Sequence, residues 1–147
     1  MRPQPAAPDK PEATPNNKPK SDTTVADAVV VVYSTYPDHA TAETIGTALV
    51  DLHLVACANI LPPMTSIYHW NSERQRDAEV AMLLKTRASL GQRLIAEIKA
   101  RHPYENPAIL LFHPSGGSPP FLEWIMAQTA ETAETADMSV GTLDDPS

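Results

Sequence analysis

The run of residues 54–85 constrains the fold most strongly, because it is extended in character over three successive segments. Proline cannot donate to a β ladder, so the pair Pro62-Pro63 predicts that a first strand, at 54–61, ends there. Strand-forming residues resume at 64–70, and the polar stretch 71–77 predicts a turn. Alternating apolar residues after this turn predict another strand. The last two segments therefore predict a β-hairpin.

A strand and a helix precede this run. The β-branched segment 28–34 is apolar on both faces, which predicts a central strand. Asp38 is placed to cap a helix. The apolar stripe of that helix is Ala42, Ile45, Leu49 and Leu52. This spacing predicts a helix that packs one face on a sheet.

A helix, a strand and a further helix follow it. Ser89 and Gln92 match a capping box, and Pro103 ends the helix that begins there. The predicted buried face of this helix is Leu90, Leu94, Ile95 and Ile98. Segment 107–112 predicts a last strand, and Ser118 with Pro119 predicts the start of a third helix.

The resulting order, β-α-β-β-α-β with an added C-terminal helix, predicts an α+β fold of the ferredoxin-like type. In this plan an antiparallel sheet carries two helices on one face. The opposite face alternates apolar residues and needs cover, which a second copy of the chain supplies most simply. We expect this domain to occupy residues 28–130.

The two ends of the chain differ from its middle. Residues 1–27 hold six of the fifteen prolines and few large apolar side chains, so we expect this segment to be disordered. Residues 131–147 carry five acids and no base, and we expect an acidic, disordered tail. The net charge of the whole chain is −7, and the tail accounts for most of it.

Composition narrows the classes of function. Residues 28–130 carry a charge near −2 and no basic stripe, which argues against nucleic-acid binding. No apolar stretch is long enough for a membrane span, and the first residues lack the apolar core of a secretory signal. A single cysteine cannot form an intrachain disulfide, which fits the reducing cytoplasm.

Four groups of residues carry a family resemblance. The first is Pro37-Asp38 with Ala40 to Ala42, and the second is Leu54 to Ile60 with Thr65 to Trp70. The others are Glu79-Val80 with Met82 to Thr86, and His102-Pro103-Tyr104-Glu105 with Phe121-Leu122 and Trp124. In this order, over residues 28–128, they resemble the CutA family of divalent-cation tolerance proteins.

This resemblance implies a fold like that of the PII signalling proteins and a tight homotrimer whose hairpin arms extend the sheets of neighbouring subunits. It also implies tolerance of divalent metals, with copper or another divalent cation bound by some members. No enzymatic reaction is common to the family, so the resemblance implies neither an enzyme nor a required cofactor.

The chain departs from the family pattern at four places. Ser72 stands where the family usually has glycine, and Arg74 stands where an aliphatic residue is usual. The conformation of the turn is therefore an open question. Ala108 replaces a carboxylate that could line the cleft between subunits, and His113 adds an imidazole near the end of the last strand.

Cys57 and His102 are the candidate metal ligands. A cysteine thiolate suits copper(I) or zinc, but Cys57 between two alanines is also typical of a small buried apolar residue. His102 could bind metal or carry a proton, and it could equally serve as the C-cap of a helix. The spacing of a closed zinc site is missing, so any metal site must use distant segments or another subunit.

The resemblance also implies an intersubunit cleft. Its candidate lining residues are Trp70, Glu79, Lys85, Tyr104 and Glu105. Interface packing is the alternative for the aromatic residues, because such side chains are enriched in oligomer cores.

Three functions follow. The favoured one is a metal-binding tolerance protein, and the second is a PII-like trimer that senses a small ligand and presents its altered turn to a partner. The third is an enzyme that uses Glu79, His102 and Tyr104 as acid and base groups.

Overall fold

The computed structural model describes residues 27–130, so both predicted disordered ends, except Asp27, lie outside the described residues. The strands are β1 (Val29–Tyr36), β2 (Cys57–Ile60), β3 (Met64–Trp70), β4 (Glu73–Arg87) and β5 (Ile109–Phe112). The helices are α1 (His39–Asp51), α2 (Gly91–Arg101) and α3 (Pro119–Gln128), with a short 3-10 turn at Ala88–Leu90. None of the helices within 27–130 has the length and apolar character to cross a membrane.

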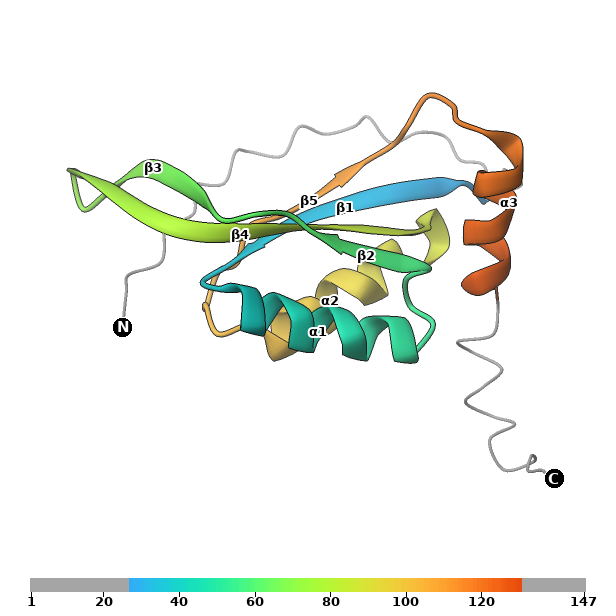
Figure 1. Ribbon diagram of the computed structural model, residues 1–147, viewed down its shortest axis with the longest axis horizontal. Coiled ribbons are helices and arrows are strands. Elements are labelled where there is room, and N and C mark those ends of the chain that lie inside the picture. Colours follow the sequence, from blue (N-terminus) through green and yellow to red (C-terminus); the bar gives the residue numbers. More distant parts are fainter. Residues whose placement is uncertain (1–26, 131–147) are drawn as a thin grey trace, which may run out of the picture.

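The sheet confirms the predicted ferredoxin-like arrangement. Its order is β2-β4-β1-β5 with every pair antiparallel, and β3 pairs with the first half of β4. Helices α1 and α2 lie side by side under one face of the sheet, whereas α3 stands at one end (Figure 1). The domain therefore has two layers and one covered sheet face.

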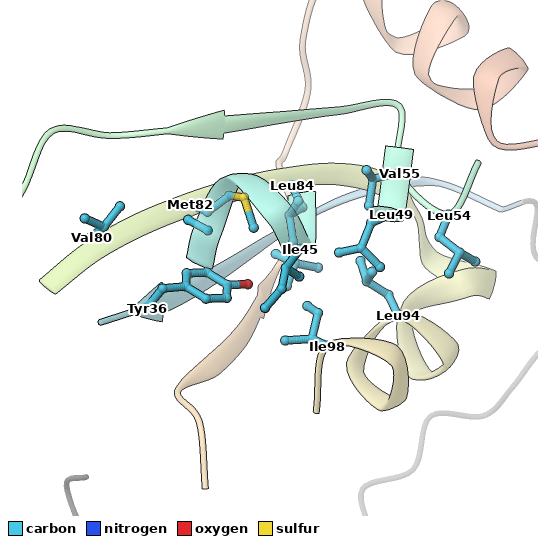
Figure 2. Close-up of a cluster of buried hydrophobic side chains, with 12 residues drawn as sticks. Tyr36, Ile45, Leu49, Leu54, Val55, Val80, Met82, Leu84, Leu94 and Ile98 are labelled. Carbon is cyan, nitrogen blue, oxygen red and sulfur yellow. The ribbon is translucent and has the colours of Figure 1, made fainter. Parts of the chain in front are cut away.

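The core lies between this covered face and the two helices, as Figure 2 shows. Asp38 caps α1 as predicted, since its Oδ1 accepts a hydrogen bond of 2.8 Å from the Thr41 amide. Ile45 and Leu49 of α1 meet Leu94 and Ile98 of α2 in the same buried cluster. The predicted helical stripes therefore fix how the helices sit on the sheet.

The hairpin β3–β4 projects past the helices as an arm (Figure 1). The predicted turn over 71–77 is wrong, because β4 begins at Glu73, which pairs with Trp70. Only Asn71 and Ser72 turn the chain, with φ of 54° and 65°. Two left-handed residues suffice for a tight hairpin whose twist matches its strands, so the polar residues that follow remain in register.

The bounds of β2 and the end of α1 also differ from those predicted. The strand predicted at 54–61 spans only Cys57–Ile60, since Leu54 is buried in the core outside the ladder. Leu52 was expected in the buried stripe of α1, but the helix ends at Asp51 and leaves Leu52 41% exposed.

The predicted capping box at Ser89 is also wrong. Leu90 occupies the N-cap position of α2, and no side chain caps the helix there. The Ser89 amide donates instead to Asp27 Oδ1 at 2.9 Å, and Arg87 forms an ion pair with Asp27 at 3.2 Å. Asp27 replaces a local cap because it lies just before β1 and beside the end of β4, and local spacing cannot reveal this contact.

Helix α3 is fastened to β4 by Arg87, whose guanidinium donates to Thr129 Oγ1 at 3.2 Å and to the Met126 carbonyl. Ser118 is at the predicted N-cap position, although its side chain makes no capping hydrogen bond. Phe121 is exposed and stacks on the exposed Trp124, with ring centroids 5.8 Å apart. One side of α3 is thus apolar and is not covered by other residues of the range 27–130.

Candidate functional site

The end of α2 places His102 in the domain, because Pro103 stops the helix and leaves His102 as its C-cap. The ring Nε2 lies 2.7 Å from the Thr35 carbonyl oxygen, and Nδ1 accepts a hydrogen bond of 3.1 Å from the Tyr104 amide. An accepting Nδ1 carries no proton, so Nε2 carries it and donates to Thr35. Both ring nitrogens are therefore engaged.

Aromatic rings enclose this imidazole. The His102 ring stacks on Tyr36 at a centroid distance of 4.8 Å and meets Tyr104 at 4.9 Å. Burial lowers the pKa of His102, while the hydrogen bond to Thr35 and the negative charge of Glu79 oppose this shift without reversing it. His102 is consequently neutral at physiological pH.

Glu79, whose charge acts on this ring, lies at the base of the arm and is only 5% exposed. Its Oε1 accepts a hydrogen bond of 2.7 Å from Ser66 of β3, and its Oε2 lies 3.5 Å from the Thr35 hydroxyl of β1. The carboxylate is therefore buried among hydroxyl donors from two strands of its own chain, and its place in an intersubunit cleft stays a prediction.

Tyr36 completes the group and was not foreseen as a site residue. It shares a hydrogen bond of 2.6 Å with Ser34, and burial raises its pKa to about 12, against the opposing effect of that bond. The polar pair Ser34-Thr35 inside an otherwise apolar strand was the signal that could have pointed here. We call Ser34, Thr35, Tyr36, Glu79 and His102 the polar cluster.

Cys57 lies elsewhere, on the sheet face that the helices leave open. It stands directly opposite Lys85 in the register of β2 and β4. Lys85 donates to the Asn59 side-chain oxygen, and Cys57 Sγ lies 3.9 Å from that same oxygen. The half-buried thiol is free and has an ammonium-bearing side chain as its cross-strand neighbour.

This open face continues onto the neighbouring strands. Val31 and Tyr33 of β1 alternate with the buried core positions and share their face with Lys85 and Leu83. Phe112 and Leu110 of β5 stand opposite them and are 51% and 55% exposed. Large apolar side chains therefore surround the region of Cys57 and Lys85 without cover from the described part of the same chain.

The two predicted metal ligands do not meet within one chain. Cys57 faces Lys85, which pairs with Val31, whereas His102 bonds to Thr35, four residues further along β1. Across residues 27–130, no group of three or more histidine, cysteine, aspartate or glutamate side chains could hold a metal ion. Within residues 27–130 of one chain, the two predicted ligands therefore do not form a metal site, and a site that uses distant segments or another subunit stays a prediction.

The predicted cleft residues divide in the same way. Glu79 and Tyr104 accompany His102, and Lys85 accompanies Cys57. Trp70 lies at the tip of the arm opposite Glu73, and Glu105 is exposed after the end of α2.

A separate cavity of about 390 Å³ lies between α3 and the start of β1. Its walls include Val29, Leu122 and Met126, with carboxylates from Asp27 and Glu123. These residues belong neither to the polar cluster nor to the open face around Cys57. The cavity is thus a feature of how α3 packs, apart from the predicted ligands.

The family model described as CutA1 divalent ion tolerance protein matches residues 30–128. A divalent-cation tolerance protein CutA from Pectobacterium atrosepticum is 37% identical over 107 residues, which cover 73% of this chain and 96% of the relative. A CutA homolog from Xenopus laevis is 35% identical, with 71% and 70% covered.

Solved structures agree with this match. CutA1 from Ehrlichia chaffeensis superimposes with a TM-score of 0.69 at 35% identity, covering 72% of this chain and 99% of that one. CutA1 from Oryza sativa gives the same TM-score and identity, with 71% and 95% covered. The sequence match, the strand order and the projecting arm all lead to one conclusion: the chain belongs to the CutA1 family of divalent ion tolerance proteins.

Proposed function

We propose that this protein acts in divalent-cation tolerance as a homotrimer that binds a divalent metal ion, copper or a similar ion, and so contributes to the response to metal. The observation that carries the proposal is the open sheet face, which holds the free thiol of Cys57 among exposed apolar residues. Names of relatives that specify divalent-cation tolerance support the metal part.

The trimer is proposed from the uncovered surface. Leu110 and Phe112 are about half exposed on the open face, and Phe121 and Trp124 add an apolar stripe on α3. Contiguous apolar surface of this kind is typical of an interface. Association of three copies through these faces, with the arms reaching neighbouring subunits, covers it and adds buried apolar area to a small core.

The metal is proposed to bind where chains meet. Cys57 supplies one soft sulfur donor per chain, and copies that pack through the open face can bring several donors together. His102 can join only if a ring nitrogen gives up its bond to Thr35 or to the Tyr104 amide. We therefore expect Cys57 to contribute more to metal affinity than His102.

The proposal gives the polar cluster no catalytic role. Tyr36, with its pKa raised to about 12, is poorly matched to proton transfer near neutral pH, and both nitrogens of His102 are occupied. No required cofactor is included in the proposal. We place the protein in the cytoplasm, where a free thiol such as Cys57 stays reduced.

Equilibrium dialysis with Cu²⁺ and with Zn²⁺ tests the metal part. We expect Cys57→Ser to weaken binding by at least about tenfold, since it removes the only thiol donor. His113→Gln is the matched control, because this exposed histidine lies outside the polar cluster. Equal metal binding by the wild type and Cys57→Ser would contradict the assignment of Cys57.

Light scattering after size exclusion tests the trimer. Leu110→Glu introduces a charge on the open face and should shift the mass toward a single chain. Leu52→Glu is the matched control, because Leu52 is also exposed but lies at the end of α1. A mass that responds equally to both changes would argue against assembly through the open face.

A second candidate, a PII-like trimer that senses a small ligand in the intersubunit cleft, draws support from the arm. Asn71 and Ser72 form a tight, exposed turn at its tip. Such a turn is suited to presentation to a partner. Capture of a cellular protein by the wild type and not by a variant with Asn71-Ser72 replaced by Gly-Gly would favour this second function.

A further inference from the structure

The two faces of the arm differ in charge. Cross-strand partners in an antiparallel pair share a face, so the register assigns each residue to one side. The partners of Arg74 and Arg76 are His69 and Ile67, which makes a face with two guanidinium groups and no acid. Glu73 and Asp77 lie on the opposite face. We call Ile67, His69, Arg74 and Arg76 the basic face.

The basic face continues the helix-facing side of the sheet. Val80, Met82 and Leu84 of β4 belong to the core between sheet and helices, and strand residues alternate between the two sides. Arg74 and Arg76 therefore lie on the same side of β4 as the core. Neither guanidinium has an ion pair with another residue of the range 27–130. A single chain thus leaves two positive charges on this side of the arm without partners.

A groove of about 290 Å³ lies on the same side of the sheet, between α1 and β2. We call six of its lining residues, Glu43, Gly46, Val50, Asp51, Ala58 and Ile60, the acidic groove. Helix α1 carries no lysine or arginine. Asp51 has no ion pair within residues 27–130, and Glu43 has only the exposed His39, at 3.6 Å. The groove therefore has two carboxylates along α1 and apolar side chains between them.

Strand β2 forms one wall of this groove and is an edge strand. Among residues 27–130 it pairs with β4 alone. An edge strand presents backbone groups that can pair with a strand of another chain. Ala58 and Ile60 pack against the core, so they mark the helix-facing side of β2. A strand that is added beside β2 therefore places its helix-facing side chains next to α1, at the acidic groove.

The arm of the same chain cannot be that strand. Tyr36, at the end of β1, is the cross-strand partner of Val80, and α1 begins shortly after it. Arg76 lies four residues beyond Val80, about 13 Å further along β4. The arm projects past the helices there, whereas Asp51 lies at the opposite end of α1 (Figure 1). Contact between the basic face and the acidic groove therefore requires a second copy of the chain.

The two surfaces match in spacing and in charge. Arg74 and Arg76 are two residues apart on a strand, about 7 Å. Glu43 and Asp51 are eight residues apart on a helix, about 12 Å. Two long arginine side chains can share the remaining difference of about 5 Å. The basic face also offers a large apolar side chain that is 65% exposed, and the groove offers Val50, which is 37% exposed.

We propose that the arm of one copy lies beside β2 of the next copy, with Arg74 and Arg76 paired to Glu43 and Asp51 and with Ile67 at the apolar part of the groove. This inference rests on the proposed homotrimer and names the surface that receives each arm. Because arm and groove are different surfaces, the contact is heterologous, and copies joined in this way can close into a ring. Complementary charge also fixes the position of the arm along the groove.

Zero-length carbodiimide cross-linking tests the contact directly. The full chain carries Arg76→Lys, which keeps the charge and adds a reactive amine, and is refolded from equal parts of ¹⁵N-labelled and unlabelled chains. We expect mass spectrometry to find links from position 76 to Glu43 or Asp51 of a differently labelled chain. Glu73→Lys is the matched control, because it places an amine on the opposite face of the arm. Links to the groove should be at least about fivefold more frequent from position 76 than from position 73.

Charge reversal and its rescue test the pairing. Arg74→Glu with Arg76→Glu should raise at least about tenfold the protein concentration at which half of the trimer dissociates, measured by light scattering over dilutions in moderate urea. Adding Glu43→Arg and Asp51→Arg restores opposite charges, and the concentration should return to within about threefold of the wild-type value.

The matched control for charge reversal is Arg93→Glu with Lys99→Glu. It makes the same change in net charge at two exposed positions of α2, outside the basic face and the acidic groove. We expect the concentration of half dissociation to stay within about twofold of the wild-type value. A control that weakens the trimer as much as reversal on the arm would assign the effect to net charge and overturn the pairing.

The outcomes separate this inference from the proposed homotrimer. A single-chain mass for the wild type before dilution would remove the homotrimer and this contact together. A wild-type trimer without links from position 76 to the groove would leave the homotrimer standing and overturn the contact. Links confined to chains of one label would place the contact within one chain. A reversal on the arm that the groove changes do not rescue would show that these charges are not partners.

Discussion

The pH dependence of stability around His102 provides the sharpest prediction from the polar cluster. His102→Gln removes the titratable ring but keeps an amide that can donate to the Thr35 carbonyl. At pH 8 we expect His102→Gln to cost about 2–4 kcal/mol of the free energy of unfolding. This figure combines one lost hydrogen bond, worth about 1 kcal/mol, with two lost ring contacts of about 0.5–1.5 kcal/mol each.

The difference in the free energy of unfolding between the wild type and His102→Gln should shrink as the pH falls. Because burial lowers the pKa of His102 in the folded protein, the unfolded chain binds a proton first. The stabilising contribution of neutral His102 is therefore complete above its ordinary pKa of about 6.5 and is lost as the pH falls toward the folded value. One proton gives a slope of at most about 1.4 kcal/mol per pH unit.

Urea unfolding of metal-free wild type and His102→Gln, at fixed protein concentration between pH 8 and pH 5.5, measures this gap. We expect it to narrow by up to about 1.4 kcal/mol by pH 5.5. His113→Gln controls for an exposed histidine and should run parallel to the wild type. A gap that stays constant, or one that widens in acid because Glu79 holds a charged imidazole, would refute the reasoning.

Three further predictions concern the framework. Partial burial raises the pKa of Asp27, but hydrogen bonds from Ser89 and other donors outweigh this effect, so the pKa is lowered. In urea unfolding, Asp27→Asn should therefore cost about 1–2 kcal/mol of the free energy of unfolding at pH 7. The cost should be smaller below pH 3, where the carboxylate becomes protonated. Ser72→Gly should raise the melting temperature, gaining up to about 1 kcal/mol, because φ at Ser72 is 65°. Leu94→Ala should cost about 2–5 kcal/mol, whereas the exposed control Leu52→Ala should cost less than about 1 kcal/mol by the same measurement.

Local chemistry was enough to predict much of the fold. Asp38 caps α1, Pro62-Pro63 separates β2 from β3, and Pro103 ends α2, since each effect acts within a few residues. The strand order also follows from the sequence of elements. Where the prediction failed, contacts between distant segments decided the outcome. The Ser89 amide, for example, donates its hydrogen bond to Asp27, which lies far away in the sequence.

The arm shows a different limit of predicting structure from sequence. Polar residues at 73–77 resemble a turn in isolation, but pairing with β3 keeps them in a strand. Composition cannot distinguish a solvated two-stranded ribbon from a loop, because both of its faces meet water. The register is also what separates Arg74 and Arg76 from the acids of the opposite face.

The candidate site was predicted in part. Glu79, His102 and Tyr104 do lie together, but Tyr36 and Thr35 complete the cluster through stacking and a backbone carbonyl that a motif cannot show. Cys57 is at the predicted place on β2. Whether it binds metal remains a prediction, since no group of metal-ligating side chains forms among residues 27–130 of one chain.

Metal content and mass measured on one sample test the central proposal most directly. Light scattering after size exclusion, run without metal and after dialysis against Cu²⁺, should give three times the chain mass of 15.9 kDa in both cases. Copper should co-elute with the wild-type trimer and be lost from a Cys57→Ser trimer. A single-chain mass in both runs, or a wild-type trimer that elutes without copper, would contradict the proposal of a metal-binding homotrimer.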